Sequence, residues 1–302
     1  MSALFYIYDA NQYGVIMKKT IAIFTATHVR FNKPSEPIYI PLHVGRAGKE
    51  DLGYIGDNTG INISDLNWLY GELTGLFWIW QNVYDIDYVG LCHYRRYFLD
   101  NSEIMRREKY LEILGEYDAI VSKHFDCGTK YRNYYGKAHN VNDIDAVGNA
   151  IKNIYPEYVE SFNTAMIGSI FYSGNLVVTK LEILKGYAEW LFNVFAEASE
   201  NIDVSKYDSY HKRVYGFLSE QLFYVYLLRN KYTYYEAPVG IAQEKAETRE
   251  LIDSLKNMIS KNEIDNAKKT FDKSLIERPD LLLPGSDING ELEALYQELK
   301  LK

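Results

Sequence analysis

Residues 85–98 read DIDYVGLCHYRRYF, and the architecture expected for the whole chain follows from this stretch. Its apolar middle, YVGL, has the composition of a strand buried on both faces of a parallel or mixed sheet. A polar run, Cys92–Arg96, follows where the strand ends. Ligands of α/β proteins bind beyond the carboxyl ends of the strands. The polar run therefore stands where a ligand is expected, whereas Asp85 and Asp87 stand at the opposite end of the strand.

Apolar strands and amphipathic helices alternate around this stretch. A buried first strand is expected at residues 20–28 (TIAIFTATH), a long irregular segment at 31–64, and a helix capped by Ser64 over 64–83. Further helices and strands are expected around residues 103–117, 117–124, 143–155, 174–180, 181–200, 209–230 and 232–240. The order β-loop-α-β-α-β predicts an α/β fold in which helices flank a parallel or mixed sheet.

The composition changes near residue 243, after which the chain is rich in lysine and glutamate at helical spacing. Two surface helices, packed as an antiparallel pair, and a final helix are expected there. At the other end, Met17-Lys18-Lys19-Thr20 looks like a bacterial translation start that runs directly into the first strand. The expected organisation is an N-terminal extension at residues 1–16, one large domain at 17–242 and a helical tail at 243–302.

The bulk composition argues against several classes of protein. The net charge is −8, whereas a protein that binds duplex nucleic acid needs a basic face, so no nucleic-acid partner is expected. The two cysteines make neither a disulfide framework nor a zinc pattern. No apolar run approaches the roughly 18 residues that span a bilayer, and residues 1–16 lack a secretory signal, so a cytoplasmic location is expected. The 28 tyrosines suit clefts that hold sugars or bases, with compositional drift in an AT-rich genome as the alternative.

Common catalytic motifs are missing from the sequence. It contains no GxxxxGK[ST], GxGxxG, HExxH, GxSxG or paired CxxC, so hydrolase and dehydrogenase functions lack their usual support. Asp85-x-Asp87 has the spacing of an acidic metal motif. Because these acids precede the strand, a solvated turn is expected there, and no residue is assigned as a metal ligand.

The polar run at the strand exit has two interpretations. Arg95 and Arg96 can bind a pyrophosphate through forked, bidentate hydrogen bonds, and His93 can donate to a phosphate oxygen or a sugar hydroxyl. The alternative is a structural ion-pair cluster with acids from a neighbouring helix. Glu72 lies in an apolar, aromatic context, and an arginine of the HYRR segment is its expected partner.

The segment GDNTGINIS, residues 56–64, leads into the predicted helix N-terminus. Free N–H groups at such a terminus can bind an anion, so Asn62 and Ser64 are candidate ligand contacts. Their alternative role is simply to cap the helix.

Together, GDNTGINIS, ELTG and CHYRRYF closely resemble a bacterial family known as domain of unknown function 4422. The resemblance runs from about residue 20 to about residue 240, and the tail lies outside it. Members are found among capsule, exopolysaccharide and O-antigen glycosyltransferases, with galactofuranose as the sugar assigned most often. The resemblance implies a GT-A-like, Rossmann-type mixed sheet. It also implies an enzyme that moves a sugar from a UDP-sugar donor to a glycan or lipid-linked acceptor. A lipid-linked acceptor would bring the protein to the inner face of the plasma membrane as a peripheral protein.

The resemblance also suggests roles for individual residues. The expected donor-binding residues are Thr25, Thr27, His28, Asn62, Ser64, Glu72, Arg95, Arg96, His139 and Asn175. His93 is expected to act with the two arginines on the leaving diphosphate. If transfer inverts the anomeric centre, a carboxylate must deprotonate the acceptor hydroxyl, and Asp143 is the first choice and Glu220 the second. Asp143 as a helix N-cap and Glu220 as a buried ion-pair partner are the alternatives. Gln221 stands where the family usually has arginine.

No cofactor is assigned with certainty. The two arginines can do much of the work of a metal ion, while Mg²⁺ or Mn²⁺ remains compatible with the site.

Two other functions stay open. A non-catalytic sugar-nucleotide- or glycan-binding scaffold would use the helical tail to join a polysaccharide assembly complex. A nucleotidyltransferase would need strand-exit acids for Mg²⁺, and none is well placed.

Overall fold

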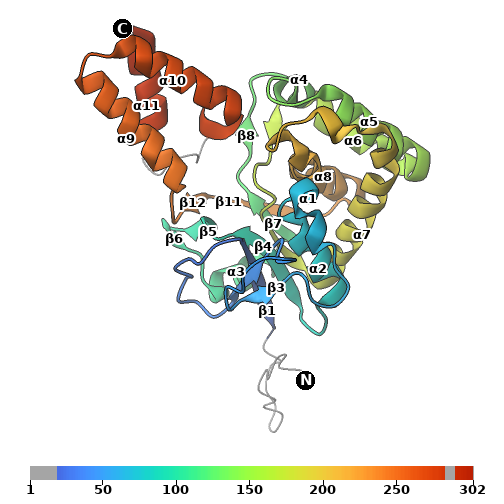
Figure 1. Cartoon of the computed structure of the whole chain (residues 1–302). Coiled ribbons are helices and arrows are strands. Elements are labelled where there is room, and N and C mark those ends of the chain that lie inside the picture. Colours follow the sequence, from blue (N-terminus) through green and yellow to red (C-terminus); the bar gives the residue numbers. More distant parts are fainter. Residues whose placement is uncertain (1–18, 283–289, 302) are drawn as a thin grey trace.

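The computed structural model describes residues 19–282 and 290–301 (Figure 1). The extension expected at residues 1–16 and the expected translation start at Met17-Lys18 lie outside the described residues. Within them, the chain forms a central sheet, helices on both of its faces, and three further helices after the sheet is complete.

The central sheet is mixed, as predicted. Its main path runs in the order β11-β7-β10-β4-β1-β2-β3, and β10 is antiparallel to both of its neighbours. The path contains β1 (Ile21–Thr27), β2 (Tyr39–His43), β3 (Ile55–Gly56), β4 (Tyr88–His93), β7 (Ala119–Ser122), β10 (Val177–Lys180) and β11 (Tyr234–Ala237). A branch leaves β4 through β5 (Arg96–Asp100), which pairs with β6 (Glu103–Ile104) and β12 (Val239–Ile241). A separate two-stranded sheet joins β8 (Phe125–Asp126) to β9 (Ile170–Phe171).

The quoted stretch forms the centre of this sheet. In β4, Val89 and Leu91 pack into the core on one face while Tyr88 and Cys92 pack into the core on the other, as the period of two in a strand requires. Gly90 lets β10 approach closely, because a Cβ there would lie 2.8 Å from the backbone carbonyl oxygen of Val177. The strand is thus covered on both faces, and only its ends can reach solvent.

Helices cover both faces of the sheet. The larger core lies under α2 (Leu73–Asn82), α4 (Tyr131–Tyr135), α5 (Val141–Ile154), α6 (Val159–Ile167), α7 (Leu181–Ala198) and α8 (Val214–Asn230). The smaller core lies under α3 (Arg107–Ile113) and the branch strand β5. Each helix buries one apolar stripe against the sheet or a neighbouring helix, which confirms the predicted α/β class.

Two sequence expectations near residue 64 are wrong. The helix predicted over 64–83 is divided into a 3₁₀ turn at Ser64–Leu66, α1 (Asn67–Tyr70) and α2, because Gly71 takes a left-handed φ of 57°. The segment expected to be irregular contains β2 and β3. Proline is rare inside a sheet because it lacks an N–H group, yet Pro41 lies within β2. This is tolerated because β3 pairs only with Leu42 and His43, so that β2 is an edge strand at Pro41.

The last three helices enclose a small core of their own. These are α9 (Ala246–Ser260), α10 (Ile264–Glu277) and α11 (Glu291–Leu301), which follow β12 and stand to one side of the sheet in Figure 1. Ile252, Leu255, Phe271 and Leu292 are buried among them. In the described part of the chain, no helix combines the length and the apolar character needed to cross a membrane.

Candidate active site

Residues far apart in sequence meet at the edge of the sheet where β4 ends. Because β10 is antiparallel to β4, its amino end lies at the same edge as the carboxyl end of β4. Side chains from the α1–α2 junction and from α8 approach this edge. The group is called the strand-exit cluster and consists of Glu72, His93, Arg96, Asn175 and Glu220.

Asn175 connects three elements within the cluster. Its Nδ2 donates to Glu72 Oε1 (2.5 Å) and to the carbonyl oxygen of Gly216 (3.1 Å), and its Oδ1 accepts from the Ser219 hydroxyl (2.9 Å). The residue has a left-handed φ of 52°, which asparagine tolerates better than most residues. Asn175 was expected to bind the donor, but these bonds give it the role of a brace that positions Glu72 against α8.

Glu220 is the carboxylate with the most perturbed protonation. Burial and the negative charge of Glu72 raise the pKa of Glu220 to about 8, although the Gly174 N–H and the charges of Arg96 and Arg213 oppose the shift. Its Oε1 accepts a hydrogen bond from the Gly174 N–H (2.9 Å). The side chain stays partly exposed, so it can reach a substrate.

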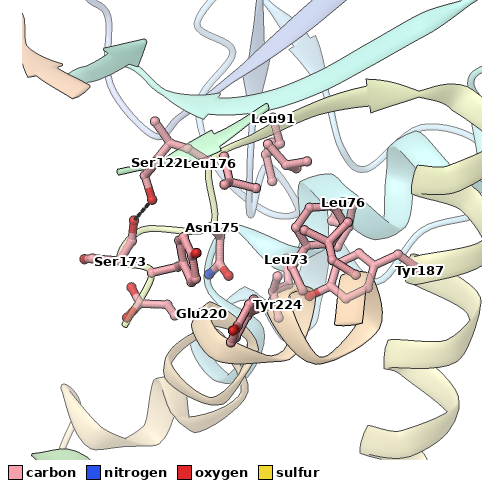
Figure 2. A pocket seen from close by; sticks show the side chains of 15 residues that line it. Leu73, Leu76, Leu91, Ser122, Ser173, Asn175, Leu176, Tyr187, Glu220 and Tyr224 are labelled. Atoms are coloured by element: carbon pink, nitrogen blue, oxygen red, sulfur yellow. Dashed lines mark hydrogen bonds between the residues drawn. The ribbon is translucent and has the colours of Figure 1, made fainter. Parts of the chain in front are cut away.

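A narrow cavity of about 30 Å³ accounts for the poor solvation of Glu220. Figure 2 shows Glu220, Asn175 and Ser173 at one end of this cavity and Leu73, Leu76 and Leu91 at the other. An apolar wall behind a carboxyl group favours its neutral form. Strongly perturbed carboxyl groups in clefts are typical of functional sites.

His93 is held neutral at the end of β4. Burial lowers its pKa, and Arg96 and Arg95 lower it further, while Glu72 opposes them. Its Nε2 lies 3.8 Å from Glu72 Oε1 and makes no hydrogen bond within the described residues. In the absence of a ligand, His93 is therefore expected to offer a diphosphate a hydrogen bond rather than a charge.

The two arginines take different positions. Arg96 lies against the backbone of Gly174, where a Cβ would stand 3.0 Å from Arg96 Nη1, and Gly174 has a φ of +91° that favours glycine. Arg95 stacks over the ring of Tyr94, 5.1 Å from its centroid. His28 meets the same ring edge-on at 5.6 Å, so Arg95 and His28 flank Tyr94 at the exits of β4 and β1.

Burial lowers the pKa of His28, and the nearby charges of Arg95 and Lys49 lower it further. Lys49 is exposed, in the loop that follows β2. Arg95 and Lys49 thus bring positive charge close to His28 at the exit of β1, and the negative charge of Glu247 opposes them only in part.

Three of the residues expected to contact the donor already have partners within the protein. Thr25 is fully buried with its hydroxyl 3.4 Å from Cys92 Sγ, and the Thr27 hydroxyl donates to the Val29 carbonyl oxygen (2.7 Å). Asn62 forms a local turn, accepting from the Ser64 N–H (3.2 Å) and donating to the Gly60 carbonyl oxygen (2.9 Å). Their polar atoms serve the core and the loop rather than the surface of the site.

Ser64 belongs to a buried network around Asp57 that sequence reasoning did not find. The Asp57 carboxylate accepts from the N–H groups of Gly45 (2.7 Å) and Arg46 (3.0 Å), and from the hydroxyls of Ser64 and Thr74 (2.6 Å for Thr74). These bonds fasten the loop after β2 to α2. The only sequence signal was an acid between glycine and asparagine in GDNTG, which a turn explains equally well.

Replacing Asp57 with asparagine is expected to destabilise the fold by about 3 kcal/mol. Asparagine has nearly the same shape, but its NH₂ group would face donors that now have an acceptor. Urea denaturation measures the change. Asp51→Asn is the matched control, because Asp51 is exposed, accepts from the nearby Gly53 N–H, and has only a long ion pair (3.7 Å) with Arg46. If both variants unfold at the same urea concentration, the structural role of Asp57 is contradicted.

Asp85 and Asp87 do lie at the entrance of β4, away from the cluster. Asp87 accepts from the N–H (2.7 Å) and hydroxyl (2.9 Å) of Thr20, which ties the start of β1 to the start of β4. Across residues 19–282 and 290–301, no group of three or more His, Cys, Asp or Glu side chains is arranged to hold a metal ion. Gln221, at the position of the family's arginine, is fully buried and bonds to the backbone of Ile170 and Tyr172.

Asp143 and His139 lie in a second pocket, lined by α4, α5 and the start of α8. This aromatic pocket contains Tyr135, His139, Asp143, Tyr207, His211 and Phe217. The Tyr207 hydroxyl bonds to both carboxylate oxygens of Asp143 at 2.9 Å, and burial raises the pKa of Asp143. The N-cap of α5 is Asn140, not Asp143. Asp143 and Glu220, the two candidate bases, thus occupy different pockets.

Comparison with known proteins places this geometry in context. The chain is similar to the apo structure of WbbM, a bifunctional glycosyltransferase, with a TM-score of 0.67 and 27% sequence identity. The similarity covers 75% of this chain but only 46% of that protein, so the chain spans about half the length of its neighbour. No curated protein matches the sequence significantly. The mixed sheet flanked by helices is thus one that a glycosyltransferase also has.

A family profile covers most of the sheet and its helices. Residues 22–231 match the family described as a domain of unknown function, DUF4422. This range includes every member of the strand-exit cluster and of the aromatic pocket, and it ends before β11. Because the match extends over more than half of the chain, the protein belongs to the DUF4422 family.

Proposed function

We propose that the chain is a glycosyltransferase that uses a nucleotide-sugar donor. The observation that carries the proposal is the strand-exit cluster, in which a carboxylate of raised pKa, Glu220, lies beside Arg96 and a neutral His93. Sugar transfer from a nucleoside diphosphate needs these two parts, a base for the acceptor hydroxyl and cations for the leaving diphosphate. Similarity to WbbM and membership of the family support the reaction class.

The donor diphosphate is proposed to lie over the exits of β1 and β4. Arg95 and Arg96 would each offer forked hydrogen bonds to phosphate oxygens, and His28 and Lys49 stand at the rim of the same exits. The neutral His93 would contribute a hydrogen bond rather than a charge. UDP-galactofuranose is the first donor to test, on the strength of the resemblance to capsule and O-antigen enzymes, with a glycan or lipid-linked oligosaccharide as acceptor.

Glu220 is proposed as the base of an inverting transfer, ahead of Asp143. Glu220 shares its surroundings with Arg96 and Glu72, whereas both oxygens of Asp143 already receive the Tyr207 hydroxyl. In the step, Glu220 takes the proton of an acceptor hydroxyl. The acceptor oxygen forms a bond to the anomeric carbon, and the bond from that carbon to the diphosphate breaks, leaving its electron pair on the diphosphate oxygen.

A donor screen tests the proposed function. Purified protein is incubated with a panel of nucleotide sugars, UDP-galactofuranose included, with and without EDTA, and the release of nucleoside diphosphate is followed. Release from at least one donor is expected, and its persistence in EDTA is expected because the arginines carry the positive charge. If no nucleotide sugar is consumed and none binds, the transferase proposal is wrong. If transfer depends strictly on Mg²⁺ or Mn²⁺, the role proposed for the two arginines is wrong, whereas the transferase assignment stands.

The rate of transfer is expected to rise with pH up to a plateau above about 8. A general base works only when deprotonated, and the raised pKa of Glu220 keeps its carboxyl group protonated below that value. On the acid side, kcat/KM should fall roughly tenfold per pH unit. A profile that is flat across neutral pH would contradict Glu220 as the base.

A further inference from the structure

The aromatic pocket has a volume of about 360 Å³, and the transfer step described above does not use its side chains. Ligand pockets usually enclose roughly 300–1,000 Å³, so this one suits a small ligand such as one sugar residue. Its chemistry differs from that of the strand exits, because aromatic rings and a carboxylate line it in place of paired arginines.

One wall of the pocket is a stack of rings. The ring of His139 lies on Phe217 with centroids 4.3 Å apart and planes inclined by 29°, and Tyr135 and Tyr210 lie within 4.7 Å and 6.2 Å of His139. Burial, together with the charges of His211 and Arg213, lowers the pKa of His139 to about 4, so the ring is neutral near pH 7. Flat, neutral rings of this kind pack against the apolar face of a sugar ring.

The pocket lining also carries fixed polar groups. Asn140 Nδ2 donates to the Tyr207 oxygen (2.9 Å), and Tyr207 in turn donates to Asp143. His211 is held by the Ala138 carbonyl oxygen (2.8 Å) and by Asp208 (2.8 Å). A carboxylate has about four acceptor positions, so Asp143 can still accept sugar hydroxyls after its bonds to Tyr207. These polar groups are thus held in place before any ligand binds.

The hydroxyl of Tyr135 is a buried polar group that stands out in the pocket. Tyr135 lines the pocket and is only 4% exposed, yet its hydroxyl makes no hydrogen bond among the residues that the structure describes. Leaving a buried hydroxyl unpaired is unfavourable, and a ligand hydroxyl in the pocket would pair with it. Besides the volume and the lining of the pocket, the unpaired hydroxyl is an independent sign that the pocket receives a polar ligand.

The pocket shares a helix with the proposed base, although Glu220 is not among its lining residues. Phe217 and Glu220 are three residues apart in α8, so they share one face of the helix and are neighbours on its surface. Burial raises the pKa of Tyr135, and the negative charges of Asp143 and Glu220 raise it further. A ligand held at Phe217 would therefore lie within one helical turn of Glu220.

We infer that the aromatic pocket binds the terminal sugar residue of the acceptor glycan. The sugar ring packs on Phe217 and His139, its hydroxyls bond to Asp143 and Tyr135, and one hydroxyl points to Glu220. The inference rests on the proposed function and deepens it, because it assigns the acceptor to a neutral sugar and separates its site from that of the donor diphosphate.

Saturation-transfer NMR tests the inference with a panel of methyl glycosides of glucose, galactose, mannose, N-acetylglucosamine and rhamnose. Wild-type protein should bind at least one of them, with a Kd on the order of 1 mM. Tyr135→Phe, which removes one oxygen without an internal partner, and Phe217→Ala should each weaken binding roughly tenfold. Tyr155→Phe is the control: Tyr155 lies at the other end of α5, and its hydroxyl accepts from Asn193.

UDP affinity, measured on the same samples, separates the two proposals. UDP binding without any glycoside signal, or equal glycoside signals from wild type and Phe217→Ala, would overturn the acceptor assignment and leave the transferase standing. Glycoside binding that depends on Phe217 and Tyr135 supports the pocket. If the wild type binds neither UDP nor any nucleotide sugar of the donor panel, the transferase is instead overturned, and with it the acceptor role of the pocket.

Discussion

Replacing Glu220 with glutamine is expected to lower the rate of transfer by roughly 10²–10⁴-fold. Glutamine keeps the size of the side chain, and its amide oxygen can still accept the hydrogen bond from the Gly174 N–H. What it loses is the ability to take a proton. Because the glutamine variant keeps Arg95 and Arg96, its affinity for UDP should remain close to that of the wild type. Steady-state kinetics and calorimetric titration with UDP measure the two effects.

The competing candidate base provides the control for this experiment. Asp143→Asn is expected to retain most of kcat while raising KM for the acceptor, because Asp143 is assigned to sugar binding. If Asp143→Asn abolishes turnover while Glu220→Gln transfers at nearly the normal rate, the two roles are exchanged and the assignment of the base is wrong.

The pH dependence of stability independently tests the raised pKa of Glu220. Its folded-state pKa of about 8 lies above the ordinary value of 4.5, so this residue destabilises the fold increasingly as pH rises through that interval. Above pH 8, Glu220→Gln should therefore be more stable than the wild type by about 5 kcal/mol, and below 4.5 the difference should vanish. Equal stabilities at all pH values would show that Glu220 is normally solvated.

Removing Arg96 should have the next largest effect. Arg96→Ala is expected to lower kcat/KM by roughly 10²–10³-fold, because the guanidinium is proposed to stabilise the charge that develops on the leaving diphosphate. Arg96 also holds down the pKa of Glu220, so its loss should move the pH–rate profile to higher pH. Arg96→Lys should recover only part of the activity, since lysine cannot make the forked contact.

A surface arginine provides the comparison for Arg96. Arg132 pairs with Asp145 at 2.6 Å, and both side chains are about half exposed, so Arg132→Ala should change neither turnover nor the pH profile. Arg96→Ala with normal kcat/KM and an unshifted profile would contradict both the phosphate role and the electrostatic link to Glu220.

The polarity of a single strand was enough to predict at which end of the sheet the CHYRR segment lies. An apolar run followed by CHYRR can end only at a sheet edge, and the acids before it can only lie at the opposite end. The mixed sheet, the order of its main helices and the position of His93 and Arg96 follow from such local patterns. An arginine of the HYRR segment was expected to be the partner of Glu72, whereas its contacts are with Asn175 and His93.

The finer arrangement depends on contacts between distant segments. Asn175 braces the cluster through a left-handed backbone, and Asp57 gathers donors from two loops and α2, neither of which leaves a periodic signal in sequence. Thr25 and Thr27 were expected at the surface because they end a strand, yet neighbouring strands bury them. The raised pKa of Glu220 depends on Glu72 and an apolar wall, both fixed only by packing.

The transferase assignment depends most on Glu220 and on a nucleoside diphosphate at the exits of β1 and β4. The deciding measurement is acceptor-stimulated release of UDP from UDP-galactofuranose, or from the donor that the screen identifies, by wild type and Glu220→Gln side by side. We expect release by the wild type, and near-complete loss in the variant with UDP affinity preserved. Equal release by both proteins, or no affinity for UDP in either, would contradict the proposed reaction and its site.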